Sequence, residues 1–407
     1  MNQARAGALP SAGALPVSLI VWGALGVALN VGLARFTYGV MLPSLRRDLG
    51  LDYLGGGSLN AVHLAGYLIG TLAAPWLGRR LGMPRLSRHA HLVVAAGALL
   101  CAAAPPNAVW GSLVLGVGRL ATGLGAGAGI VAILVLVFAA VSAARRPLVS
   151  AVVWAGMGAA VVVSALAVPV LLDTSFGWRC AFLVSAALAL AVALSFPPKR
   201  MRSGVNAAAP AAPSADVARM ILSPQWLFLI AGYFMFGVAY IAYSTFAGAR
   251  LAAAAAPNAV IAATWSAFGI AAMVGAALTV PVLGSQRAKR FALIAALVSG
   301  ALGALLAAFS TAAAALAGAL LVGLGIAATP TIVSAHARDR CSANDYPKVF
   351  SFASAALGAG QLVGPVAGGA LADVFGTAAV PLFAAAAYLL AALFAACDAA
   401  VADRTQR

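Results

Sequence analysis

The sequence contains no glutamate, and its nine acidic residues are all aspartates. Charged residues of both signs make up only 8% of the 407 residues. A soluble domain covers its surface with roughly a quarter charged residues, so this scarcity excludes an ordinary water-soluble protein. Hydrophobic residues make up 63% of the chain, which indicates that lipid is its main solvent.

The sequence also lacks the patterns that carry enzymatic or metal chemistry. Its four cysteines are far apart, show no metal-ligand spacing and lie among apolar neighbours: Cys101, Cys180, Cys341 and Cys397. There is no phosphate-binding loop ending in GK[ST], no carboxylate pair, and no cluster of nucleophile and base, so an intramembrane enzyme is not indicated. We therefore expect no enzymatic activity, no cofactor and no bound metal.

The net charge of +16 has a topological explanation. The basic residues stand in short loops between apolar runs, as cytoplasmic loops of membrane proteins do. A nucleic-acid-binding surface would interleave basic and aromatic residues, which this sequence does not show. We expect a lipid bilayer, and no nucleic acid, as the partner.

Apolar runs long enough to cross the hydrocarbon core recur along the chain. They predict an all-α membrane protein with twelve transmembrane helices, at residues 17–41, 55–77, 90–104, 109–140, 147–171, 180–197, 224–247, 258–283, 291–310, 312–336, 348–372 and 378–399.

The basic residues orient these helices. With both termini in the cytoplasm, 19 of the 25 Lys and Arg residues fall in cytoplasmic segments, four fall in outer loops and two lie within spans. The first apolar run is predicted to span the membrane rather than to be a cleavable signal peptide. A multi-pass protein of a bacterial inner membrane is expected.

A polar stretch rich in Pro and Ala interrupts the pattern after the sixth span. It predicts a cytoplasmic linker at 199–223 between two six-helix bundles, at 1–198 and 224–407. The halves resemble each other at an offset of 205, since Gly32-x-x-Arg35-x-x-Tyr38 corresponds to Gly237-x-x-Tyr240-x-x-Tyr243. Parallel duplication of this kind places a binding site at the bilayer midplane between the halves.

Arg35 and Arg119 are the two cations within spans. A cation in hydrocarbon costs at least about 3 kcal/mol, so such a residue usually faces a cavity or a partner. Either arginine is a candidate to bind an anionic group through its several donors, or to be a structural residue that bonds helix carbonyls. Arg119 is also a candidate for proton coupling. No aspartate lies within a span beside them, so an anionic substrate would itself supply the countercharge.

His63 is the mid-span residue that titrates near neutral pH, and it is the candidate proton carrier. The alternative is an ordinary hydrogen-bonded histidine of the interior. Aromatic side chains beside a few polar groups suit a small-molecule cavity, although helix packing explains each of them equally well. The further candidates for substrate binding are Asn30, Tyr38, Tyr67, Trp154, Tyr240, Tyr243, Trp265 and Gln361.

These features together resemble the major facilitator superfamily over nearly the whole chain. The segment GRLATG, which contains Arg119 and Gly123, is similar to the Arg-x-x-x-Gly motif of the fourth helix in that family, where the Arg is implicated in substrate or proton coupling. The segment LARFTYGVMLPSLRRDLGL at 33–51 resembles the YbfB/YjiJ-type branch. The resemblance implies two six-helix bundles and alternating access.

One loop departs from the pattern of the family. Its loop between the second and third helices usually reads Gly-x-x-x-Asp-Arg-x-Gly-Arg, and here it reads WLGRRLGMPR. Arg80 and Gly82 fit, but Arg79 stands where the Asp is expected. These three residues are the candidate gating loop, and the missing Asp alters the gate that the resemblance implies.

The sequence therefore predicts a monomeric secondary transporter, driven by a gradient and coupled to a proton, that moves a small organic anion or amphipathic metabolite. Two alternatives stay open. One is a drug or sugar efflux permease in which both arginines are structural. The other is a membrane receptor or assembly factor that transports nothing, which would have a closed apolar centre.

Overall fold

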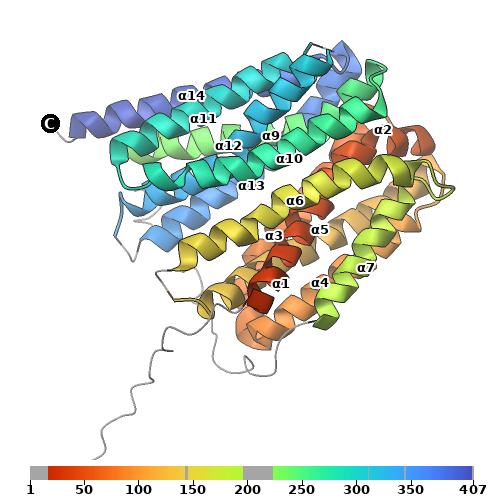
Figure 1. Cartoon of the computed structure of the whole chain (residues 1–407), viewed down its shortest axis with the longest axis horizontal. Helices are drawn as coiled ribbons and strands as arrows, with labels where there is room; N and C mark the ends of the chain where they lie inside the picture. Colours follow the sequence, from red (N-terminus) through yellow and green to blue (C-terminus); the bar gives the residue numbers. More distant parts are fainter. Residues whose placement is uncertain (1–16, 143–144, 196–222, 310, 343–344, 406–407) are drawn as a thin grey trace, which may run out of the picture.

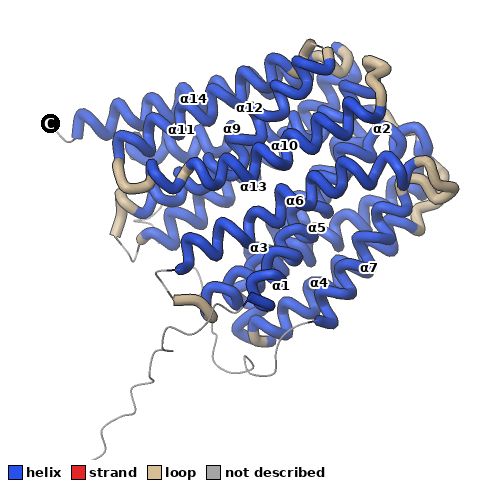
Figure 2. The backbone as a smooth tube through the Cα atoms, in the orientation of Figure 1, coloured by secondary structure: helices blue, strands red, loops and turns tan. Residues whose placement is uncertain are grey.

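The structure is a computed structural model that describes residues 17–142, 145–195, 223–309, 311–342 and 345–405. Within these ranges the chain forms helices and loops and no strand (Figure 2). The predicted linker at 199–223 lies almost entirely outside the described residues. Many large apolar side chains point outward, among them Val109 and Phe291 with 73% and 76% exposure, as expected of a surface that faces lipid.

The described part of the first predicted bundle contains six consecutive helical segments, the first of which is built from three pieces. They are α1 (Val17–Val27), η1 (Ala28–Phe36) and α2 (Thr37–Leu49), followed by α3 (Tyr53–Leu81), α4 (Met83–Ala102), α5 (Ala108–Ala139), α6 (Arg146–Leu172) and α7 (Arg179–Ser195).

The second group follows from Pro224 onward and again contains six helices. They are α9 (Pro224–Ala253), α10 (Asn258–Leu278) with a short 3₁₀ turn η4 (Val280–Val282), α11 (Gln286–Leu306), α12 (Ala312–Arg338), α13 (Tyr346–Phe375) and α14 (Ala379–Thr405).

Ten of these helices are long and apolar enough to cross a membrane. The third and sixth predicted spans do not meet the same standard within the described residues. The third, α4, begins at Met83 rather than 90, so that it includes Arg85, Arg88 and His89 and is less apolar. The sixth, α7, has 17 described residues, because its predicted end at 197 lies beyond them.

Several helices are longer than their apolar runs, because polar residues form their ends. The first helix continues through Pro43 to Leu49, so Arg46 and Arg47 lie in its last turn rather than in a loop. Basic residues in a last turn interact favourably with the negative end of the helix dipole. Gly50, with φ of 62°, ends this helix, and the Asp52 side chain caps the next one by accepting from the Gly55 amide at 2.6 Å.

Within each group, glycines let the helices approach closely. A Cβ atom on Gly123 of α5 would lie 2.0 Å from the His63 carbonyl oxygen of α3, so this crossing requires glycine. In the second group α9 packs against α13 and α14, while α12 packs against α10 and α11. Figure 1 shows the red-to-green helices of the first group beside the green-to-blue helices of the second.

Among the described residues the two groups pack mainly through three helix pairs, namely α6 with α10, α3 with α13, and α2 with α9. The contacts are again glycine-based: a Cβ on Gly158 of α6 would lie 2.5 Å from the Gly269 carbonyl oxygen of α10. At the end of the α3–α13 pair, the Asp373 carboxylate accepts from the amides of Tyr53 and Leu54, each at 2.8 Å. This carboxylate of one group therefore binds the N-terminus of a helix of the other.

Candidate functional site

Arg35 and Arg119 are both buried in the helical core, with exposures of 7% and 1%. Arg35 comes from η1, which is π-helical, and Arg119 comes from α5. Among the described residues no carboxylate forms an ion pair with either arginine. The centre therefore holds two positive charges that neutral groups alone surround.

Arg35 is held by tyrosines from two other helices. Its Nη1 donates to the Tyr240 hydroxyl of α9 at 3.0 Å, and its guanidinium carbon lies 4.7 Å from the centre of the Tyr67 ring of α3. Its Nε and Nη2 are buried without a hydrogen-bond partner in the described part of the chain. Arg35 thus has two buried donor nitrogens that no described group satisfies.

Both terminal nitrogens of the Arg119 guanidinium donate to neutral acceptors. Its Nη1 donates to the Ala34 carbonyl oxygen at 2.8 Å, and its Nη2 donates to the Asn60 side-chain oxygen at 2.7 Å. The guanidinium carbon lies 4.4 Å from the centre of the Tyr38 ring, whose hydroxyl donates to the Gly56 carbonyl at 2.7 Å. Backbone, amide and aromatic groups therefore fix this side chain.

Asn60 and Thr245 extend the network, and sequence reasoning missed them both. The Asn60 amide donates to the Thr245 hydroxyl at 2.8 Å, and that hydroxyl donates to the Ile241 carbonyl at 2.7 Å. Asn60 lies on the same face of α3 as His63 and Tyr67, so its helical spacing from them was the available signal. The network links α5 through α3 to α9.

His63 is fully buried against α5. Its Nδ1 lies 3.1 Å from the Thr122 hydroxyl, which in turn donates to the Arg119 carbonyl at 2.9 Å. His63, the predicted proton carrier, is therefore linked through Thr122 to the backbone of Arg119. Its Nε2 has no partner among the described residues.

Asn30 lies elsewhere, in a separate buried pair with His91 of α4. Its amide nitrogen lies 3.1 Å from His91 Nε2, and His91 Nδ1 lies 2.7 Å from the Ser87 carbonyl oxygen. His91 lies near the start of the third predicted span and is buried, so His63 is not the single buried histidine within the predicted spans.

The remaining aromatic candidates are only partly drawn into this centre. Tyr240 stacks on Phe236 at 5.0 Å, while Tyr243 stacks on Phe268 at 6.3 Å and Trp265 packs edge-on against Phe268 at 5.5 Å. Trp265 is buried between the groups, beside Gly39.

Trp154 of α6 and Gln361 of α13 are half-buried and buried respectively. Neither of them has a hydrogen bond to Arg35 or Arg119 among the described residues. The structure brings together Arg35, Tyr38, Tyr67, Arg119 and Tyr240, and it adds Asn60 and Thr245.

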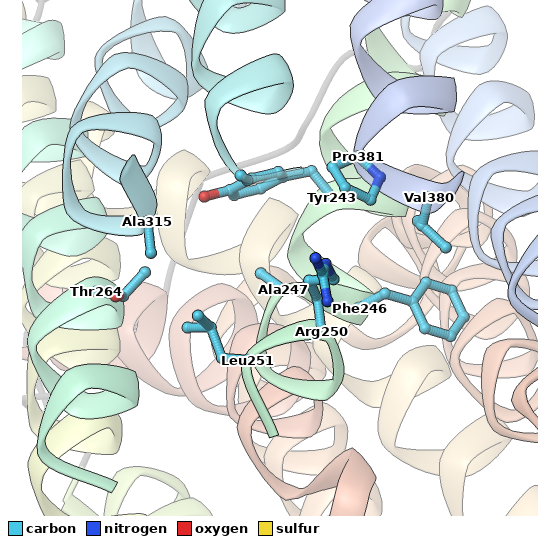
Figure 3. A pocket seen from close by; sticks show the side chains of 10 residues that line it. Tyr243, Phe246, Ala247, Arg250, Leu251, Thr264, Ala315, Val380 and Pro381 are labelled. Atoms are coloured by element: carbon cyan, nitrogen blue, oxygen red, sulfur yellow. The ribbon is translucent and has the colours of Figure 1, made fainter. Parts of the chain in front are cut away.

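Tyr243 lines a different pocket, inside the second group. Figure 3 shows its ring near Arg250 and Phe246 of the same helix, with Thr264, Ala315 and Pro381 around the space. Arg250 donates to the Ala308 carbonyl at 2.9 Å. Tyr243 is therefore not a neighbour of Arg35 in this conformation.

The space beside Arg119 is small. Most of its lining is apolar, with Arg119, Tyr38 and Thr122 among the exceptions, and it has room for about one water molecule. The centre is thus closed in this conformation, although it contains two buried arginines.

The candidate gating residues are mostly helical. Arg79 and Arg80 form the last turn of α3, and only Gly82 stands in the turn, where its φ of 80° favours glycine. Arg80 lies over the Trp76 ring at 4.3 Å. No carboxylate pairs with Arg79 or Arg80 in the part of the chain that the structure describes, in line with the missing Asp.

A cluster of charges at the corresponding end of the second group was not predicted. His336 of α12 lies 3.0 Å from Asp398 of α14, which also accepts from Arg340 at 2.6 Å. Lys289 of α11 pairs with Asp339 beside them. These ion pairs join the ends of α11, α12 and α14. They do not contact the central arginines Arg35 and Arg119.

The chain is similar to one protein family in sequence and to solved transporter structures in fold. The family model described as "Uncharacterised MFS-type transporter YbfB" matches residues 27–397. No curated protein sequence matches the chain. Among solved structures, a crystal structure of a mutant of the nucleoside transporter NupG is similar with a TM-score of 0.74 and 14% identity, covering 93% of this chain and 99% of that one. At this identity the likeness shows a shared fold alone.

Proposed function

The chain belongs to the YbfB-type family of the major facilitator superfamily, and from this premise we propose that it carries a small organic anion or amphipathic metabolite across the membrane. Membership makes it a multi-pass membrane transporter rather than an enzyme. The substrate class is inferred from the centre of the molecule.

One observation carries the anion proposal: Arg35 is buried with two unpartnered donors and no described carboxylate beside it. A charge in the membrane interior costs at least about 3 kcal/mol unless a partner compensates it. A carboxylate or similar group of the substrate would accept from Nε and Nη2 in the bidentate geometry that arginine favours. Tyr67, whose ring centre lies 4.7 Å from the Arg35 guanidinium carbon, would contact the rest of such a substrate.

We also propose that the helices form two six-helix bundles, 1–198 and 224–407, joined by a linker at 199–223 and related by duplication. The offset of 205 supports this. Arg35 hydrogen-bonds Tyr240, and a Cβ on Gly39 would meet the Ser244 carbonyl oxygen at 2.3 Å. Both pairs are 205 residues apart. Equivalent residues of two repeats meet only near the axis that relates them, so α1–α2 and α9 would flank that axis.

Alternating access would then be a rocking of the two bundles about the centre. Both termini would be cytoplasmic, in a bacterial inner membrane, as the distribution of Lys and Arg indicates. A proton is the proposed coupling ion, with His63 and Arg119 as its candidate residues, and a monomer is sufficient because the centre is built from one chain.

A thermal-shift screen of the purified protein tests the proposal, with organic anions, neutral sugars and cationic drugs as probes. We expect an anion to raise the melting temperature of wild type and to lose this effect in Arg35→Gln. Arg47→Gln is the matched control, since it removes an equal charge from an exposed position and should respond as wild type.

Stabilisation by neutral or cationic compounds that survives Arg35→Gln would overturn the anion proposal and favour the efflux alternative. Failure of every compound class to stabilise wild type or to be transported in vesicles would favour a protein that transports nothing.

A further inference from the structure

The two central arginines use their donors differently. Arg119 commits two of its three guanidinium nitrogens to protein acceptors and leaves Nε unpartnered among the described residues, while Arg35 commits one and leaves Nε and Nη2 unpartnered. Arg119 is also the more deeply buried, and its ring partner Tyr38 is itself fully buried. Tyr67, the ring partner of Arg35, is only half-buried. Arg119 is therefore built into the protein, whereas Arg35 is available to a ligand.

The protein acceptor that Arg119 holds is the residue directly before Arg35. Ala34 and Arg35 share one peptide unit, which is planar and rigid. A hydrogen bond to the Ala34 carbonyl at 2.8 Å therefore restricts the direction in which the Arg35 side chain leaves the backbone.

The surrounding backbone makes this restriction necessary. Ala34 and Arg35 lie near the end of η1, a nine-residue π-helical stretch between two α-helical segments. π-Helical hydrogen bonding is rare and less stable than α-helical bonding, and the change of register at its end disturbs the pairing of backbone carbonyls. Return of this stretch to α-helix would rotate Arg35 about the helix axis, away from Tyr67 and Tyr240.

We propose that Arg119 is a positioning residue, which holds the Ala34 carbonyl and so keeps η1 in the register that presents Arg35 to the substrate anion. The role of Arg35 rests on the function proposed above, whereas the hold of Arg119 on η1 does not depend on any substrate. Arg119 does not itself bind the anion.

The anchor of Arg119 is firm enough for this role. Its helix α5 packs against α3 with backbone contact at Gly123, and Asn60 of α3 receives the second terminal nitrogen. Asn60 in turn bonds Thr245 of α9. The position of η1 is thus fixed from α5 and α3, and the same network reaches the helix that supplies Tyr240.

Hydrogen–deuterium exchange on the protein without ligand tests the hold directly. In Arg119→Gln we expect amides of residues 28–38 to exchange about tenfold faster than in wild type, since a hydrogen bond from a charged donor contributes that much. In Arg35→Gln, the matched change on the same network, they should exchange within twofold of wild type. Equal exchange in Arg119→Gln and wild type, or an equal increase in both variants, would overturn the proposal.

Binding of the anion found by the thermal-shift screen separates positioning from direct contact. Arg119→Gln should weaken that binding about tenfold but keep the preference for the anion over its neutral amide analogue. Arg35→Gln should remove the preference. Loss of the preference in Arg119→Gln with retention in Arg35→Gln would overturn the assignment.

Arg119→Lys gives a second variant if Arg119→Gln does not fold. A lysine keeps the charge and one donor to the Ala34 carbonyl, so the exchange of residues 28–38 should be intermediate, and exchange as slow as in wild type would contradict the need for the fork. If wild type shows no preference for anions, the proposed function fails, and the exchange experiment still decides whether Arg119 holds η1.

Discussion

His63 and His91, the buried histidines of the first group, differ in the use of their ring nitrogens. Both nitrogens of His91 are occupied, by the Ser87 carbonyl and the Asn30 amide, an arrangement that a neutral ring satisfies. His63 uses only Nδ1, with Thr122, and its Nε2 is unpartnered among the described residues. Of these two residues, His63 is therefore the one that can accept a proton, at Nε2, without losing a hydrogen bond.

We predict that His63→Gln flattens the dependence of transport on external pH between about pH 5 and pH 8, because the proposed proton carrier is lost while the amide still bonds Thr122. His91→Gln is the matched control and should keep the wild-type profile. Uptake or release of the substrate in proteoliposomes measures this. An unchanged profile in His63→Gln would rule out the role of His63, and a flattened profile in both variants would point to a general structural effect.

Asn60 is the residue whose loss should cost the most stability in the central network. Asn60→Ala leaves Arg119 Nη2 without an acceptor and the Thr245 hydroxyl without a donor, and a buried group left unpaired costs about 1–3 kcal/mol. We expect a clear fall in the melting temperature. Thr245→Val removes two bonds between neutral groups, from the Asn60 amide and to the Ile241 carbonyl, and should cost less because no charged donor loses its acceptor. A larger loss in Thr245→Val than in Asn60→Ala would show that the bond to Arg119 contributes little.

The sequence was informative about which residues are unusual and less so about their partners. Arg35 and Arg119 were predictable as central residues because charge is so rare in these spans. Their neighbours Ala34, Asn60 and Thr245 were not, because a carbonyl, an amide and a hydroxyl are unremarkable in a list of residues and acquire a role only from helix packing. Tyr243 was predicted as one of several aromatic candidates for substrate binding, and it lines a pocket inside the second group.

At the scale of helices, each predicted apolar run falls on a helix of the described ranges, ten of them apolar enough to span, but the runs did not predict the helix ends. Helix α3 ends at Leu81 rather than 77, and the first helix runs eight residues past its predicted end. Polar and charged residues at helix ends continue the backbone hydrogen bonding beyond the hydrocarbon core, so hydropathy alone underestimates the length. The π-helical stretch η1 has no sequence signal that we recognise.

The crossing of α3 and α5 depends on glycine at one face of α5. We predict that Gly123→Ala destabilises the protein by about 1–3 kcal/mol, because the added Cβ would lie 2.0 Å from the His63 carbonyl and overpacking costs energy of this size. Gly116→Ala on the same helix meets its nearest atom at 3.6 Å and should be neutral or slightly stabilising. Thermal unfolding in detergent compares them, and equal melting temperatures would mean that the crossing adjusts to the extra atom.

In the described part of the chain the two groups pack mainly through three helix pairs, and one of these pairs ends in a charge-assisted contact. The Asp373 carboxylate accepts from two amides at the N-terminus of α3, where the helix dipole also favours a negative charge. In the orientation proposed from the distribution of Lys and Arg, this end of the helices lies at the outer face. In alternating access the two groups must separate there for the centre to open outward, and this contact must then break.

We predict that Asp373→Asn shifts the molecule toward the outward-open state. The amide is uncharged and can accept through one oxygen only, so the closed state loses about 1.5–3 kcal/mol, which changes the ratio of the two states roughly tenfold or more. Spin labels on Phe176→Cys and Asn258→Cys, two exposed positions in the two groups near this end, would report a larger population of long distances.

Asp173→Asn is the matched control, because Asp173 ends α6 much as Asp373 lies near the end of α13. Among the described residues the Asp173 carboxylate has no hydrogen bond to the other group. If both variants gave the wild-type distance distribution, the Asp373 contact would not hold the outer end closed, and the glycine-based crossings of α6 with α10 and α2 with α9 would have to be sufficient for that closure.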